Sequence, residues 1–253
     1  MEKDHGRTDY DVYIMPVKEK VFYTMLAALV IFAIAFVFYH NVVISAFACV
    51  FACFYPKIKM GEIIKQQKNN LKLQFKDMLY ALSSSLSAGR SVESALRDIL
   101  KDLFILYPDR DVSIIREVES MVRKVEMNET VESALADFAR RSHLEDVENF
   151  VDVFYTCKRT GGNIVEVIRN ASNIINDKIE IKMEMETMLA ERKFEQKVLN
   201  VLPILMVVLL SFSAGDYIAP VFNTFAGRFA MTVSIVLLTL AYFISKKIMD
   251  IKV

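Results

Sequence analysis

The chain has 253 residues, of which 54% are hydrophobic and 25% are charged, and its 31 basic and 31 acidic side chains cancel. A net charge of zero gives no electrostatic basis for binding nucleic acid, so we expect no nucleic-acid partner. Neither the three cysteines nor the three histidines have the ligand spacing of a metal site, and no cofactor motif is present. We therefore expect no catalytic, cofactor-binding or metal-ligating residues.

The first long apolar band extends from Val21 to Tyr55 and is almost free of charge. About 20 apolar residues cross the roughly 30 Å hydrocarbon core as a helix, which residues 21–39 satisfy. Residues 42–55 would reach only about 21 Å, so they form a weak second span. We expect a transmembrane hairpin over residues 21–56. The alternative is that residues 42–55 lie in the membrane interface or pack under the domain that follows.

A helical domain is predicted over residues 57–197, where Lys, Arg, Asp and Glu are frequent and apolar residues recur at three- and four-residue steps. This pattern predicts six helices. The first runs from Pro56 to a turn at Gly89, where glycine can adopt the left-handed conformation that ends a helix. Ser91 can cap the second helix, and Pro108 ends it.

The remaining boundaries of the domain are predicted from polar and glycine signals. A third helix begins near Ile114, and Asn128 begins the fourth. The segment Ser142-His143-Leu144-Glu145 has the spacing of a capping box before the fifth helix. That helix ends at Thr160-Gly161-Gly162, which is a second left-handed stop signal.

The sixth helix begins at Asn163 and meets no helix breaker before Pro203, so it could be one rod of roughly 60 Å. The alternative is a frayed linker near Asp177 to Glu191, where polar residues dominate. Three methionines in this stretch could form a partner-binding face, although core packing is the commoner use of such side chains. They are Met183, Met185 and Met188.

The second apolar band covers residues 198–245 and predicts two further spans, Val198–Ala214 and Phe229–Ile244. Lysines precede the first band, follow it and close the chain, whereas residues 215–227 contain no Lys or Arg. Short loops rich in Lys and Arg stay in the cytoplasm.

This charge pattern predicts that three parts of the chain face the cytoplasm: the amino-terminal segment 1–20, the domain 57–197 and the tail 246–253. The expected fold class is therefore all-α. We expect an integral membrane protein with about four transmembrane helices and a cytoplasmic six-helix bundle between the second and the third.

An internal repeat links two of the predicted helices. Residues 91–96 and 130–135 share the sequence Val-Glu-Ser-Ala-Leu, and each copy follows a turn, at Gly89 or at Asn128. The same five residues at the same place in two helical hairpins lead us to hypothesise a structural duplication.

Several short motifs occur along the chain in this order: Leu86-Ser87-Ala88-Gly89-Arg90-Ser91, Ala95-Leu96, Ala134-Leu135, Thr160-Gly161-Gly162-Asn163 and, in an apolar span, Leu202-Pro203. As a set, these motifs resemble the type II secretion system F family, over roughly residues 71–210. Its members are inner-membrane platform proteins of type II secretion systems, type IV pili, Tad or Flp pili and archaeal filaments.

The resemblance implies a role and a set of partners. One domain with two spans on either side is similar to the Tad-type platform subunits. In that family a six-helix cytoplasmic domain couples a hexameric secretion ATPase to the insertion of pilin subunits. The implied partners are the secretion ATPase, a paired platform subunit or further copies of the chain, pilin subunits and the lipid bilayer.

The chain has no Gly-x-x-x-x-Gly-Lys run to bind nucleotide phosphates, so the energy must come from a partner. We expect charged residues near helix ends to receive the movement of the ATPase. The alternative for each is a solvated charge that makes no specific contact. The candidates are Arg90, Arg140, Arg141, Lys158 and Arg159.

Other classes of function fit the sequence less well. A membrane-bound sensor would use the loop Gly215 to Arg228, around Asp216 and Tyr217, which is too short to build much of a pocket. A transporter would need ionisable groups at mid-membrane depth, which the four predicted spans lack apart from His40 near a turn. For an enzyme, no nucleophile, base and orienting group can be assembled. The segment Ala46-Phe47-Ala48 loosely resembles a signal-peptide cleavage site, but the apolar run before it is too long.

Overall fold

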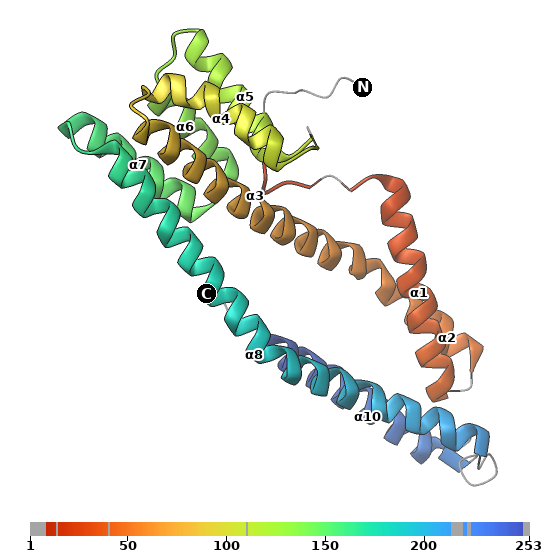
Figure 1. Cartoon of the computed structure of the whole chain (residues 1–253). Coiled ribbons are helices and arrows are strands. Elements are labelled where there is room, and N and C mark those ends of the chain that lie inside the picture. The colour runs from red at the N-terminus through yellow and green to blue at the C-terminus, as the bar shows by residue number, and fades with distance from the viewer. Residues whose placement is uncertain are drawn as a thin grey trace. The chain divides into compact units, whose positions relative to one another are not determined.

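The computed structural model describes residues 9–13, 15–39, 41–109, 111–213, 220–221 and 224–249 of the chain. Every regular element within these residues is a helix, so the all-α prediction is confirmed (Figure 1). The chain divides into two compact units, which are Met1–Ile14 with Met60–Ile181 and Met15–Lys59 with Lys182–Val253. We call them the bundle unit and the apolar unit. The predicted loop at Asp216 and Tyr217 and the last residues of the predicted tail lie outside the described residues.

Helix α1 (Val17–Tyr39) of the apolar unit packs against α2 (Val42–Ala48) and the 3-10 helix η1 (Cys49–Phe54). Small side chains fill this contact, because Ala27, Ala35 and Ala52 are all buried. Small residues allow two helix backbones to approach closely in the way that membrane helices pack. These elements therefore form a helical hairpin.

Two polar contacts lie at the turn of this hairpin. The Asn41 side chain accepts a hydrogen bond of 2.9 Å from the Val43 amide and so caps α2. The Tyr39 hydroxyl lies 2.8 Å from the Thr232 hydroxyl of α10 (Phe225–Met249), which joins the first and last helices of the apolar unit.

Four helical stretches are long and apolar enough to cross a membrane, which confirms the predicted number of candidate spans by length and composition. They are Val17–Tyr39, Val42–Ser87, Ile164–Ser211 and Phe225–Ser245. The second stretch passes from apolar to polar sequence within helix α3 (Tyr55–Ser87).

Helix α8 (Ile164–Ser213) is 50 residues long and continues through Pro203. The alternative of a frayed linker near Asp177 is therefore wrong. At 1.5 Å per residue, a helix of this length extends about 75 Å. Met183 and Met188 on this helix are 63% and 71% exposed, so the expectation that they pack in a core of the chain is wrong.

The bundle unit contains α4 (Val92–Leu106), α5 (Ser113–Glu126), α6 (Val131–Ser142) and α7 (Glu145–Thr160) with parts of α3 and α8. All six helices contribute side chains to one apolar core, so the six helices predicted from periodicity are present. Phe75 of α3 lies at its centre, with ring centroids 5.9 Å from Phe138 and 5.6 Å from Phe150.

Two predicted helix starts were wrong. Asn128 does not begin a helix but occupies a left-handed turn with φ of 65°, and Thr130 caps α6 instead. Ser142 is the last residue of α6, and its hydroxyl donates to the Ala139 carbonyl, so the capping box does not form. Only two residues separate α6 from α7, and the first of them, His143, takes the left-handed conformation that reverses the chain.

Candidate partner-binding end of the helical bundle

The six helices of the bundle unit alternate in direction, so the starts of some helices lie beside the ends of others. Three contacts show this at one end of the bundle: Arg97 Nε to Glu126 Oε1 at 3.9 Å, Lys158 Nζ to Glu132 Oε1 at 2.9 Å, and Arg169 Nη2 to Ser87 Oγ at 3.3 Å. The ends of α3, α5 and α7 therefore lie together with the starts of α4, α6 and α8. We call this the motif end.

The motif end takes its name from the turns that occur there. Gly89 and Gly161 have φ of 81° and 71°, a region that glycine enters without steric cost, so both predicted left-handed stops are confirmed. A Cβ on Gly162 would lie 2.8 Å from the sulfur of Cys157, so a larger residue there would require the Cys157 side chain to move.

Asn163 begins the next helix by a reciprocal cap. Its Oδ1 accepts a hydrogen bond of 3.3 Å from the Glu166 amide, and its Nδ2 lies 3.5 Å from Glu166 Oε2. The run Thr160-Gly161-Gly162-Asn163 is thus one unit that stops α7 and starts α8.

The repeated sequence folds in the same way twice. Ser91 Oγ accepts a hydrogen bond of 3.3 Å from the Ser94 amide, and Thr130 Oγ1 accepts one of 3.2 Å from the Ser133 amide. The following Ala-Leu pairs are almost fully buried in both copies; they are Ala95, Leu96, Ala134 and Leu135. Each copy is therefore a capped helix start whose Ala-Leu pair anchors the helix to the core.

The five charged candidates for partner contact do not form one patch. Arg90, Lys158 and Arg159 lie at the motif end, whereas Arg140 and Arg141 lie near the end of α6, which is at the opposite end of the bundle. Lys158 is paired with Glu132, and Arg90 Nε lies 3.6 Å from Asp98 Oδ2. Arg140 and Arg159 are exposed and have no ion-pair partner in the part of the chain that the structure describes.

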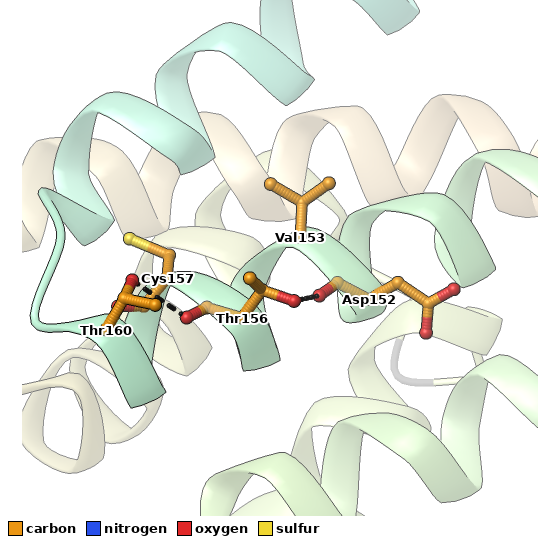
Figure 2. A pocket seen from close by; sticks show the side chains of 5 residues that line it. All are labelled: Asp152, Val153, Thr156, Cys157 and Thr160. Carbon is orange, nitrogen blue, oxygen red and sulfur yellow. Dashed lines mark hydrogen bonds between the residues drawn. The ribbon is translucent and has the colours of Figure 1, made fainter.

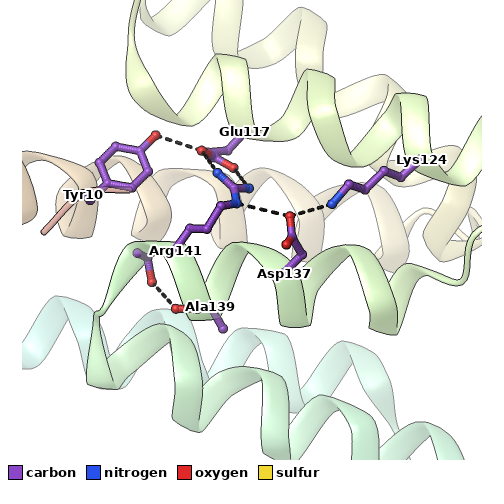
Figure 3. A network of polar contacts seen from close by, with 7 residues as sticks. Tyr10, Glu117, Lys124, Asp137, Ala139 and Arg141 are labelled. Atoms are coloured by element: carbon purple, nitrogen blue, oxygen red, sulfur yellow. Dashed lines mark hydrogen bonds and ion pairs between the residues drawn. The ribbon is translucent and has the colours of Figure 1, made fainter. Parts of the chain in front are cut away.

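Arg141 lies in a largely buried ion network (Figure 3). Its Nη1 and Nη2 donate hydrogen bonds of 2.7 and 2.5 Å to the two carboxylate oxygens of Glu117, and its Nε lies 3.1 Å from Asp137 Oδ2. The side chains of Arg141 and Glu117 are only 15% and 5% exposed. Arg141 is therefore not a solvated charge without specific contacts, because it joins α5 to α6.

The amino-terminal segment makes further contacts with this network. The sequence did not predict them. The Tyr10 hydroxyl donates a hydrogen bond of 2.9 Å to Glu117 Oε1, and the Tyr10 amide donates one of 3.1 Å to the Arg141 carbonyl. Burial and the Glu117 charge raise the pKa of Tyr10 above its ordinary value, so the hydroxyl remains a donor. Asp11 holds the same segment to Lys68 at 2.6 Å.

A family model decides the identity of the bundle. The model of the type II secretion system protein F family matches residues 78–212, which is more than half of the 253 residues. The chain belongs to the type II secretion system protein F family. This family occurs in platform proteins of type II secretion and type IV pilus systems. Comparisons with curated proteins and with solved structures gave no match.

The matched region of this F-family protein begins in α3 and ends in α8, so it contains the whole motif end. Its candidate features are contact surfaces. Within the described residues, no group of three or more His, Cys, Asp and Glu side chains is placed to hold a metal ion.

A surface hollow on α7 leads toward the motif end of the F-family domain (Figure 2). It is lined by Asp152, Val153, Thr156, Cys157 and Thr160. Thr156 Oγ1 donates to the Asp152 carbonyl and Thr160 Oγ1 to the Thr156 carbonyl, at 2.9 and 3.0 Å. Both hydroxyl protons are therefore donated to carbonyls of their own helix.

Acid should destabilise the F-family bundle through Asp146. Burial alone would raise the pKa of this carboxyl, but the hydrogen bonds from Lys178 and Lys72 outweigh burial and lower the pKa. The stabilisation is complete above the unfolded pKa of about 3.9 and is lost as the pH falls through the lower folded pKa. We expect Asp146→Asn to reduce the unfolding free energy at pH 7 by about 1.5 kcal/mol and to flatten the acid limb of a melting curve measured against pH.

The matched control is Asp152→Asn on the same helix, because Asp152 is exposed and makes no ion pair in the described part of the chain. An Asp146→Asn protein that melts like the Asp152→Asn protein at every pH would contradict the prediction.

Proposed function

We propose that this F-family protein is a non-enzymatic platform subunit of a Tad or Flp pilus, or of a related type II secretion machine, in the inner membrane. Its bundle unit faces the cytoplasm and couples a secretion ATPase to pilin insertion. The partners are the ATPase, a second platform subunit or further copies of this chain, and the pilins. The observation that carries the proposal is the family match over a helical bundle whose first and last helices continue into candidate spans.

The motif end is the proposed ATPase contact. Helix α3 begins apolar and ends polar, whereas α8 begins polar and ends apolar. The motif end contains the polar terminus of each helix, which is the end of α3 and the start of α8. These termini are the ones farthest in sequence from the apolar parts. Arg90 and Arg159 supply exposed positive charge there. A displacement received at this end would pass along α8, because no break in the helix absorbs it.

Charge reversal tests this proposal. Tagged full-length protein is purified in mild detergent from its own cells, and the secretion ATPase that accompanies it is measured by quantitative mass spectrometry. We expect Arg90→Glu combined with Arg159→Glu to lower the recovered ATPase by about tenfold or more. The two new carboxylates would face the acidic groups of the ATPase that the arginines contact in this proposal, and like charges across an interface repel. The protein alone should hydrolyse no ATP.

The control is Arg140→Glu, an exposed arginine at the opposite end of the bundle, which should leave ATPase recovery and pilus assembly unchanged. Equal recovery with both sets of variants would remove the motif end from the proposal. A preparation of wild-type protein that never contains a secretion ATPase would contradict the proposed role itself.

A further inference from the structure

A polar cavity of about 390 Å³ lies between α3 and α8 within the bundle unit. Its walls combine apolar surface with hydroxyl, amide and guanidinium groups, and none of the described residues that line it is acidic. The lining residues are Tyr80, Ser83, Ser84 and Ser87 on α3 and Arg169, Ser172 and Asn173 on α8. On each helix these residues recur at three- and four-residue steps, so one face of α3 opposes one face of α8.

Two hydroxyls in this cavity have no hydrogen-bond partner among the described residues. Ser83 and Ser172 are only 7% and 6% exposed, and neither hydroxyl makes a hydrogen bond to any residue that the structure describes. Every fully enclosed side-chain polar atom among the described residues has a partner, so these two hydroxyl oxygens keep some accessible surface, and both residues line the cavity. Each hydroxyl is therefore available to donate a hydrogen bond to a molecule that enters the cavity.

Arg169 supplies the charge of the cavity. Its Nη2 donates a hydrogen bond of 3.3 Å to Ser87 Oγ, and that hydroxyl donates one of 2.7 Å to the Ser83 carbonyl. This relay holds the guanidinium at the cavity. Arg169 has no carboxylate partner in the described part of the chain, so most of its donors remain available.

We infer that this cavity binds the phosphoryl group of a small soluble molecule. A guanidinium fork matches phosphate oxygens in pairs, and the serine hydroxyls can donate to the remaining oxygens. The cavity is larger than one phosphate ion requires and falls at the small end of the ligand-pocket range of about 300 to 1,000 Å³. Tyr80, which is 73% exposed, stands at its edge as a flat apolar wall for the rest of the molecule. The inference does not depend on the proposed platform role.

The chain contains no tryptophan, so Tyr80→Trp places a single fluorescent reporter at the edge of the cavity. The probe is inorganic phosphate, titrated into this full-length variant in a phosphate-free detergent against chloride at matched ionic strength. We expect a saturable change in emission with phosphate and none with chloride. In this background Arg169→Gln should weaken phosphate binding by about tenfold or more, and Ser172→Ala by about threefold.

Two controls locate the effect. Arg123→Gln removes an exposed arginine outside the cavity and should leave the titration unchanged, and Tyr155→Trp on α7 should report no phosphate-dependent change. Equal responses with Arg169→Gln and Arg123→Gln, or no saturable response to phosphate, would overturn the inference. A response to phosphatidic acid micelles without one to phosphate would also overturn it, because the cavity would then belong to a lipid headgroup.

Discussion

Arg141→Ala should lower the free energy of unfolding by about 3 kcal/mol, because it leaves the Glu117 carboxylate buried with the Tyr10 hydroxyl as its one remaining side-chain donor among the described residues. Removing one partner of a buried ion pair costs far more than removing an exposed charge. For a protein of this length the change corresponds to a melting temperature lower by about 6 to 12 °C. Circular dichroism of the full-length protein in detergent measures it.

The neighbouring residue is the matched control. Arg140→Ala removes the same side chain one position earlier, where it is exposed, and should change stability by less than about 0.5 kcal/mol. Two variants with the same melting temperature would show that the buried network contributes nothing to stability.

Phe75→Ala should destabilise the bundle unit by about 4 kcal/mol. The Phe75 side chain is fully buried and contacts aromatic rings of α6 and α7, so its removal loses transfer free energy and leaves a cavity. Because Phe75 connects α3 to both helices of the α6–α7 hairpin, we expect faster hydrogen exchange throughout α6 and α7. Exchange mass spectrometry of the full chain measures this directly.

Tyr155→Ala is the control for this prediction, since it truncates an aromatic residue of α7 that is 53% exposed. It should leave exchange in α6 and α7 close to that of the unaltered protein. Protection that survives in Phe75→Ala would mean that the core is organised around other residues.

Local signals in the sequence predicted most helix boundaries well. The serine cap at Ser91 and the glycine stops at Gly89 and Gly161 depend only on backbone within one or two turns, and all three are present. The boundary errors at Asn128 and Ser142 have one cause. Asn and Ser are favoured both in the cap that begins a helix and in the turn that follows one. The number of residues that link the two helices, rather than the residue type, decides which of these positions each residue takes.

The candidate site was predicted only in part. The motif residues Gly89 and Thr160 to Asn163 were recognised, and the structure brings them to one end of the bundle. The charged candidates were chosen by their nearness to helix ends, and that rule does not distinguish the two ends of an antiparallel bundle. The cavity beside Arg169 gave no sequence signal, because serines at helical spacing are equally typical of a solvated face.

The sequence by itself determined the all-helical class, the four apolar stretches, the six helices between them and the membership of the F family. Each depends on composition or on spacing within a few turns of helix. Only the tertiary structure distinguished Arg141 from Arg140 and bound Tyr10 to Glu117, which is 107 positions away in the chain. The environment of a charge is set by the segments that pack around it, and those segments are distant in sequence, so no local pattern contains that information.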